Sequence, residues 1–463
     1  MAAERTLRIG NGAGFWGDNL DVPELLVRTG DLDVLTLEYL AELTLAILSH
    51  LRSRDADSGF IPDFPELVPR LVPCLRDQPD LKIVTNAGGL NPLACARICA
   101  RELVQAGLGE TALGVVTGDD LLERIPGWID DQVDLTHMET GEPISTVADR
   151  LVSANVYLGA EPIARVLNDQ ARIALTGRVA DASLTLGPAM SHFGWAWDDW
   201  DRLAGASAAG HVIECGAQAT GGLWHRWDAI PDLANVGYPI AEVDHNGQSV
   251  ITKPEGSGGL VTPGTVAEQI VYEIDDPTCY RTPDVDVDLT GIRLNDEGAN
   301  RVALRGARGR PPGTRLKVAA VYRNGWTASG MLAVVGQGAA AKAKAAGALL
   351  LQRVRRAGFT LAETLVECLG AGDVVPGLLR PQAPPLEVML RVSVRDENRK
   401  AVERFCREFA PLVTSGPSGI AGYATGRPSV RPAFGYWPTL VDRTFIEART
   451  RVATAEEWSR ETA

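Results

Sequence analysis

The sequence predicts an α/β protein, with a doubly wound, mostly parallel sheet in its first half and a second, mixed α+β domain after it. Short apolar runs alternate with helical segments up to about residue 230, which is typical of parallel strands joined by crossover helices. From about residue 238 the strands are longer and alternate apolar with polar residues. The 463 residues, 45% hydrophobic and 22% charged, suffice for two globular domains. We therefore expect domains at 1–230 and 231–463.

The first half carries the elements of the expected parallel sheet. Its strands are short apolar runs at residues 6–10, 32–38, 81–85, 112–117 and 172–176, with a strand and a helix sharing 152–168. The expected helices cover residues 40–52, 65–75, 92–106 and 198–214. Asn91 and Pro92 fit the cap and first position of a helix, because an amide oxygen accepts from free N–H groups and proline needs none there.

The second half predicts fewer, longer elements. Expected strands lie at residues 291–295, 301–304, 316–322 and 386–395, and helices at 339–357 and 398–412. A proline-rich stretch at 376–385 fits a linker or a surface crossing.

Charge and cysteine usage limit the function. A net charge of −14 argues against nucleic-acid binding, which needs clustered Lys and Arg. The densest basic run, 301–317, is either a solvated strand pair or a patch that meets an anionic ligand. Seven scattered cysteines without a CxxC pair fit free thiols. Neither a membrane-length apolar run nor a signal peptide is evident, so we expect a cytoplasmic protein.

Polar residues follow the expected strands where each one ends. They are Asn11, Glu38, Asn86, Asp119, Glu161 and Arg178. Because the carboxyl ends of parallel strands meet at one edge of a sheet, we expect these side chains to line one pocket.

Roles for these residues follow from their chemistry. We predict that Glu38 and Asp119 are the catalytic acid and base, since paired carboxylates suit proton transfer. Asn11, Asn86, Glu161 and Arg178 would bind the substrate, Arg178 through its bidentate guanidinium. Asn91 and Asp181 fit helix caps equally well. As an alternative, Glu38, Asp119 and Glu161 would hold Mg²⁺.

Two further patterns bear on the chemistry. The loop Gly10-Asn-Gly-Ala-Gly-Phe-Trp-Gly17 has Phe15 where a dinucleotide fingerprint needs its third glycine, so we predict no nicotinamide or flavin cofactor. Cys215, in a glycine-rich segment, fits a small buried residue better than a nucleophile. Cys95 and Cys99 share a helix face and are expected to pack in the core.

Several motifs together resemble the acyclic terpene utilisation family, AtuA, over roughly residues 5–440. Among them are RIGNGAGFWGDN, NAGGLNP, VTGDD, NVYLGAEPI, LTGRVADASL and HVIECGAQATGG. The resemblance implies a place in the degradation of branched acyclic acids as coenzyme A thioesters.

These observations favour an enzyme that acts on a small organic acid or acyl thioester without a redox cofactor. Hydration or dehydration, or another lyase or isomerase step, suits paired carboxylates. The alternative is a non-catalytic acyl-binding or assembly subunit. We expect a small-molecule ligand, a homo-oligomer, and neither nucleic acid nor membrane as partner.

Overall fold

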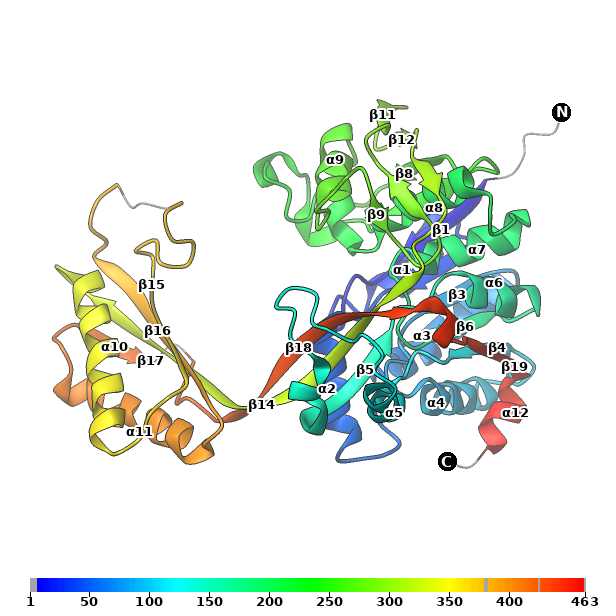
Figure 1. Cartoon of the computed structure of the whole chain (residues 1–463). Coiled ribbons are helices and arrows are strands. Elements are labelled where there is room, and N and C mark those ends of the chain that lie inside the picture. Colours follow the sequence, from blue (N-terminus) through cyan, green and yellow to red (C-terminus); the bar gives the residue numbers. More distant parts are fainter. Residues whose placement is uncertain (1–5, 379–381, 424, 462–463) are drawn as a thin grey trace. The chain divides into compact units, whose positions relative to one another are not determined.

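A computed structural model describes residues 6–378, 382–423 and 425–461, which divide into two compact units. Among the described residues, the larger unit comprises 6–321 with 437–461, and the smaller unit comprises 322–436. The α/β class is confirmed, since both units combine helices with sheets (Figure 1).

A ten-stranded mixed sheet forms the centre of the larger unit. Its five central strands are parallel and lie in the order β1 (Leu7–Asn11), β2 (Val34–Leu37), β3 (Lys82–Thr85), β6 (Ile173–Thr176) and β4 (Ala112–Thr117). Antiparallel strands extend both sides: β7 (Ile240–Val243), β8 (Ser249–Thr252), β12 (Val302–Arg305) and β11 (Arg293–Asp296) beyond β1, and β19 (Arg449–Thr454) beyond β4.

The expectation of a mostly parallel sheet therefore holds only for the centre. Strands β7 and β8 are joined by a tight turn at Asp244–Gly247, and a short turn permits only antiparallel pairing. The expected boundary at residue 230 falls inside this unit, because Ala241 of β7 pairs with Ile9 of β1. Residues 231–321 thus complete the first sheet instead of starting a second domain.

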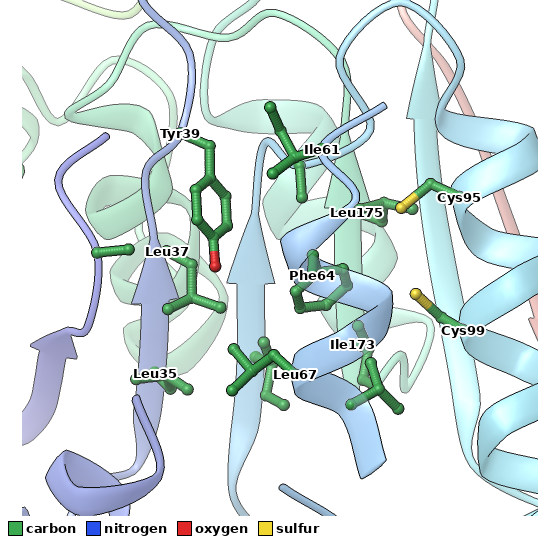
Figure 2. Close-up of a cluster of buried hydrophobic side chains, with 14 of the residues drawn as sticks. Leu35, Leu37, Tyr39, Ile61, Phe64, Leu67, Cys95, Cys99, Ile173 and Leu175 are labelled. Carbon is green, nitrogen blue, oxygen red and sulfur yellow. The ribbon is translucent and has the colours of Figure 1, made fainter. Parts of the chain in front are cut away.

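Helices pack on this sheet and supply its core. They are α1 (Val22–Gly30), α2 (Glu42–Arg52), α3 (Asp63–Asp77), α4 (Pro92–Gln105), α5 (Ile125–Asp130), α6 (Glu161–Asn168), α7 (Ser183–Phe193), α8 (Trp200–Ile213), α9 (Pro263–Val271) and α12 (Ala455–Arg460). Figure 2 shows Phe64 and Leu67 of α3 against Leu35 and Ile173 of the strands.

Cys95 and Cys99 of α4 point into the same core, as their spacing predicted. All seven cysteines are free thiols.

The remaining strands of the larger unit form smaller pairings. A three-stranded sheet consists of β9 (Tyr280–Arg281), β10 (Asp286–Asp288) and β13 (Arg308–Arg310). Strand β5 (Leu151–Val156) pairs with β14 (Arg315–Val335), as does β18 (Arg431–Asp442).

The smaller unit is a four-stranded antiparallel sheet with helices on one face. The order is β15 (Glu363–Leu369), β16 (Glu387–Asp396), β14 and β17 (Ile420–Tyr423), and the helices are α10 (Ala339–Arg356) and α11 (Arg399–Ser415). Leu350 of α10 and Phe405 of α11 pack on Leu390 of β16. The strand and helices expected at 386–395, 339–357 and 398–412 are confirmed.

The proline-rich stretch at 376–385 connects β15 and β16 inside the smaller unit, so it does not link the two units. Its residues 379–381 lie outside the described residues.

Candidate functional site

Strand register brings two of the predicted residues side by side. Leu37 of β2 is the partner of Thr85 of β3, so the next residues, Glu38 and Asn86, leave the sheet at the same level. The Asn86 amide donates to Glu38 Oε1 at 2.8 Å and accepts from the Tyr39 backbone N–H at 2.9 Å. Asn86 is completely buried, and its hydrogen bond holds the Glu38 carboxyl in place.

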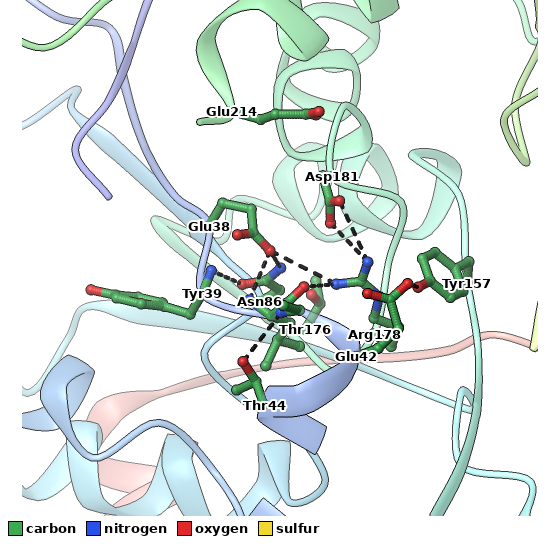
Figure 3. A network of polar contacts seen from close by, with 12 residues as sticks. Glu38, Tyr39, Glu42, Thr44, Asn86, Tyr157, Thr176, Arg178, Asp181 and Glu214 are labelled. Carbon is green, nitrogen blue, oxygen red and sulfur yellow. Dashed lines mark hydrogen bonds and ion pairs between the residues drawn. The ribbon is translucent and has the colours of Figure 1, made fainter. Parts of the chain in front are cut away.

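Glu38 lies in a buried polar network with only 6% of its surface exposed (Figure 3). Its Oε1 accepts from the Leu40 backbone N–H at 2.7 Å and lies 3.8 Å from Nη1 of Arg178. Burial raises the pKa of Glu38 well above its usual range, and the charge of Asp181 raises it further. The Arg178 charge lowers it, but less than burial raises it.

Arg178 is the cation of this network and is itself 2% exposed. Its Nη2 lies 3.2 Å from Asp181 Oδ1, its Nη1 donates to the Leu40 carbonyl, and its guanidinium stacks 4.1 Å from the centre of the Tyr157 ring. Figure 3 shows Glu38 and Asp181 on two sides of this one guanidinium. Two carboxyl groups therefore share a single buried positive charge.

Asp181 completes the pair and reaches the surface, with 33% of its side chain exposed. Burial of the carboxyl raises the pKa of Asp181, and the Arg178 charge opposes this. It does not cap α7, whose cap position is Ala182. Burial raises the pKa of both acids around this one arginine, and a pair of carboxyls with raised pKa values can share a proton, which acid–base chemistry requires.

Asp119 lies in the same region but faces the backbone. Its Oδ2 accepts from the Arg178 backbone N–H and from the Asn155 amide, both at 2.8 Å. A Cβ at Gly177 would lie 2.5 Å from both carboxylate oxygens, so a larger residue there would displace the Asp119 carboxylate. Burial raises the pKa of Asp119 to about 6. This geometry makes Asp119 a positioning residue for the turn that carries Arg178.

Asn11 is buried and bonded on all sides. Its amide donates to the carbonyls of Ile213 and Glu214 at 2.9 Å each, and its oxygen accepts from Thr36 at 3.1 Å. The predicted substrate-binding amide thus anchors the C-terminal end of α8.

Glu161 does not join the network, contrary to the single pocket expected. It is the first residue of α6, its side chain is 45% exposed, and it pairs with Arg165 one turn later. An acidic residue is favoured at a helix N-terminus without any ligand. Within the described ranges, no three His, Cys, Asp or Glu side chains are grouped as metal ligands, so Glu38, Asp119 and Glu161 do not form one Mg²⁺ ligand set.

The sequence reasoning missed the residues at the rim of the network. The Tyr157 hydroxyl donates to Glu42 Oε1 at 2.7 Å, and Lys317 Nζ lies 3.2 Å from the same oxygen. Burial alone would raise the pKa of Glu42, but these two partners and Arg178 lower it to about 2. The three residues come from α2, β14 and the segment after β5, and no local pattern reveals that these elements meet.

Most of the basic run at 301–317 is neutralised by acidic partners. Arg301 pairs with Glu242, and Arg308 with Asp201. Arg305, Arg315 and Lys317 also have acidic partners. These contacts favour the solvated, paired reading over an anion-binding patch. Asn91, by contrast, caps α4 as expected, accepting from Ala94 N at 3.3 Å.

The chain matches a known protein family over most of its length. The family model described as acyclic terpene utilisation family protein AtuA matches residues 7–452, and the chain belongs to that family. No curated protein and no solved structure matches it. In the described part of the chain, no helix is long and apolar enough to cross a membrane.

Proposed function

We propose that this protein is an enzyme that moves a proton next to the carbonyl group of an acyl thioester. One observation carries the proposal: Glu38 and Asp181 share the buried Arg178, and burial raises the pKa of both carboxyls. Enzymes tune acid–base groups toward neutral pH in this way, and such groups contribute about 10²- to 10⁴-fold to a rate.

The charge of the site favours a thioester over a free organic acid. Arg178, the buried cation of the network, already has Glu38 and Asp181 as partners, and Asp119 lies behind its backbone. Lys317, the cation at the rim, is paired with Glu42. A free carboxylate would add a further negative charge to these acids, and like charges at close range are unfavourable. A neutral thioester carbonyl avoids this cost.

In the proposed mechanism Asp181, the more exposed acid, takes the proton from the carbon next to the carbonyl. Glu38 keeps the shared proton and stabilises the negative charge that develops on the substrate oxygen. Returning the proton to the same carbon gives exchange, delivering it elsewhere gives isomerisation, and loss of a neighbouring group gives a lyase step. Arg178 and Asn86 position the two acids.

No redox cofactor enters this mechanism. Loop geometry supports that part of the proposal, because a Cβ at Gly14 would lie 2.7 Å from the Cys215 backbone. Close packing of the chain on itself therefore accounts for this glycine. Ten residues, 12–21, also separate β1 from α1, unlike the short turn of a dinucleotide site.

Solvent exchange tests the proposal. Purified protein is incubated with butyryl-CoA in D₂O, and deuterium at the carbon next to the carbonyl is measured by mass spectrometry. We expect exchange with the wild-type protein and a loss of about 10²-fold or more with Glu38→Gln and Asp181→Asn. Glu161→Gln is the matched control, because that carboxylate lies outside the network, and it should exchange normally.

The same variants separate an enzyme from a binding subunit. If butyryl-CoA binds in calorimetry but wild-type protein catalyses no exchange, the acyl-binding or assembly role replaces this proposal. Equal exchange in wild type, Glu38→Gln and Asp181→Asn would remove the two acids from the mechanism. We further propose a cytoplasmic homo-oligomer, to be tested by cell fractionation and sedimentation.

A further inference from the structure

A second buried polar cluster adjoins the first, at the end of α8. His211 Nδ1 lies 3.0 Å from Glu214 Oε1, and His211 Nε2 lies 3.3 Å from the Ile270 carbonyl oxygen. Because a carbonyl oxygen only accepts, Nε2 carries a hydrogen. The pair therefore holds one proton between Nδ1 of His211 and the Glu214 carboxyl. The Asn11 amide donates a hydrogen bond to the Glu214 backbone carbonyl and so fixes its position.

Two buried atoms in this cluster lack a hydrogen-bond partner. They are Glu214 Oε2, an acceptor, and Nε2 of Gln269, a donor on a side chain that is 2% exposed. Both residues flank Cys215: Glu214 precedes it in the chain, and the Gln269 amide lies close enough to lower the pKa of its thiol. Leaving either atom unpaired costs free energy, so the arrangement calls for a ligand.

The chemistry of the two atoms defines the ligand. A ligand of Glu214 Oε2 must donate a hydrogen bond, and a ligand of Gln269 Nε2 must accept one. A water molecule or a hydroxyl group is able to do both. A carboxylate or phosphate would bring a further negative charge to the Glu214 carboxylate, with which His211 is already paired. Glu214 lies on the Asp181 side of the proposed acid pair (Figure 3), and the charge of Asp181 raises the pKa of Glu214.

We infer that Glu214, His211 and Gln269 form a subsite that binds and activates a water molecule, or holds the hydroxyl group of a substrate. This inference rests on the proposed function, which it narrows to hydration and dehydration. Glu214 Oε2 takes a proton from the water as its oxygen bonds to the β-carbon of an enoyl thioester. The carbon–carbon π bond breaks, and the α-carbon receives a proton that Asp181 has taken up from solvent, while Glu38 keeps the shared proton. In the reverse direction the hydroxyl leaves as water.

Glu214 is suited to this step near neutral pH. Burial raises its pKa to about 7, while the hydrogen bond and charge of His211 hold it from rising further. The other charged groups that act on Glu214 are Asp181 and Glu273, and both raise its pKa. Hydration should therefore increase as pH rises through about 7. His211→Gln should shift this increase in the hydration rate to higher pH, because the hydrogen bond and charge of His211 lower the pKa of Glu214.

Hydration of crotonyl-CoA in ¹⁸O-labelled water tests the subsite. We expect Glu214→Gln to lose about 10²-fold or more of the ¹⁸O incorporation. It should keep exchange of butyryl-CoA in D₂O, which needs only the Glu38–Asp181 pair. The chain supplies a matched control: Glu268 pairs with His225 on the surface, so Glu268→Gln should leave both reactions unchanged.

A high-resolution crystal structure supplies a readout that needs no substrate. We expect one ordered oxygen within hydrogen-bonding distance of both Glu214 Oε2 and Gln269 Nε2. Wild-type hydration in Glu214→Gln, or no such oxygen, would overturn the inference while exchange of butyryl-CoA still supports the acid pair. An ordered oxygen in a protein that catalyses no exchange would keep the subsite and reject the proposed function.

Discussion

Both units contain arginine–carboxylate contacts, yet the pKa of Glu367 in the smaller unit and that of Glu38 in the larger unit shift in opposite directions. In the smaller unit, the Glu367 carboxylate accepts hydrogen bonds from Arg391 Nε at 2.6 Å and from Arg391 Nη2 at 2.9 Å, between the paired strands β15 and β16. The Arg391 hydrogen bonds lower the pKa of Glu367. In the larger unit, Glu38 shares Arg178 with another acid, and burial raises its pKa.

The difference lies in stoichiometry and burial. In the smaller unit, Glu367 is buried but has an arginine of its own, whose side chain is 31% exposed, and this pairing favours the charged form. In the larger unit, one arginine with a 3% exposed side chain is shared by two carboxyls, and burial favours the protonated form of Glu38. Residue types alone therefore do not separate a structural pair from a proton-transfer site.

Removing the arginine should show the largest difference between the two units. Arg178→Met leaves two buried carboxyls without a cation, and we expect it to lower the unfolding free energy by about 3 kcal/mol or more at pH 7. Arg391→Met should cost less than Arg178→Met, because it leaves one carboxylate instead of two without a cation and the Arg391 side chain is 31% exposed. Hydrogen exchange of β6 and β16 amides in urea measures each unit separately. Equal losses would contradict the comparison.

Arg178→Lys refines that test. Lysine keeps the charge but loses the fork that reaches both Asp181 and the Leu40 carbonyl. Because the structure pairs Arg178 with protein groups, we expect a measurable drop in melting temperature, smaller than that of Arg178→Met. An unchanged melting temperature combined with lost butyryl-CoA affinity would instead assign Arg178 to direct substrate binding.

The pH dependence of stability should have opposite signs in the two units. Asp119 has a folded-state pKa of about 6, above its unfolded value. The stability that it contributes is therefore present at low pH and is lost as pH rises through about 6. Asparagine does not ionise, so Asp119→Asn removes this loss of stability. Between about pH 4 and 7, the free energy of unfolding of the variant should rise relative to that of the wild type by up to about 3 kcal/mol.

Glu363 of the smaller unit supplies the opposite case. The Arg395 hydrogen bond lowers its pKa, so its contribution is present above the unfolded pKa and lost as pH falls through the folded one. Glu363→Gln should therefore lose stability relative to wild type as pH rises, by well under about 1 kcal/mol, since the side chain is 65% exposed. Urea titrations at several pH values check both signs, and parallel slopes would refute the comparison.

The smallest effect concerns two partly buried thiols. Burial raises the pKa of Cys215 to about 12, with Glu214 adding to it, and raises the pKa of Cys406 in the smaller unit to about 11. We expect iodoacetamide at pH 8 to label Cys215 roughly tenfold more slowly than Cys406, because the thiolate reacts. Peptide mass spectrometry gives both rates. Faster labelling of Cys215 would revive its reading as a nucleophile.

Local pattern was enough to predict much of this protein. Sequence reasoning identified the short apolar strands β1, β2, β3, β4 and β6 and the periodic helices α4, α10 and α11. It could do so because hydrophobic periodicity and helix caps depend on residues close together in the sequence. Register then explains why Glu38 and Asn86 meet, since parallel strands end at one edge.

Tertiary structure decided what each polar residue does. Glu161 follows a strand as Glu38 does, yet it is solvated on α6, while Asp181, equally readable as a cap, is paired with Arg178. The domain boundary also escaped prediction, because β7 returns to β1 over more than 200 residues of sequence. A local pattern shows which residues leave the sheet, but burial and the number of partners depend on segments distant in sequence, and these determine charge state and role.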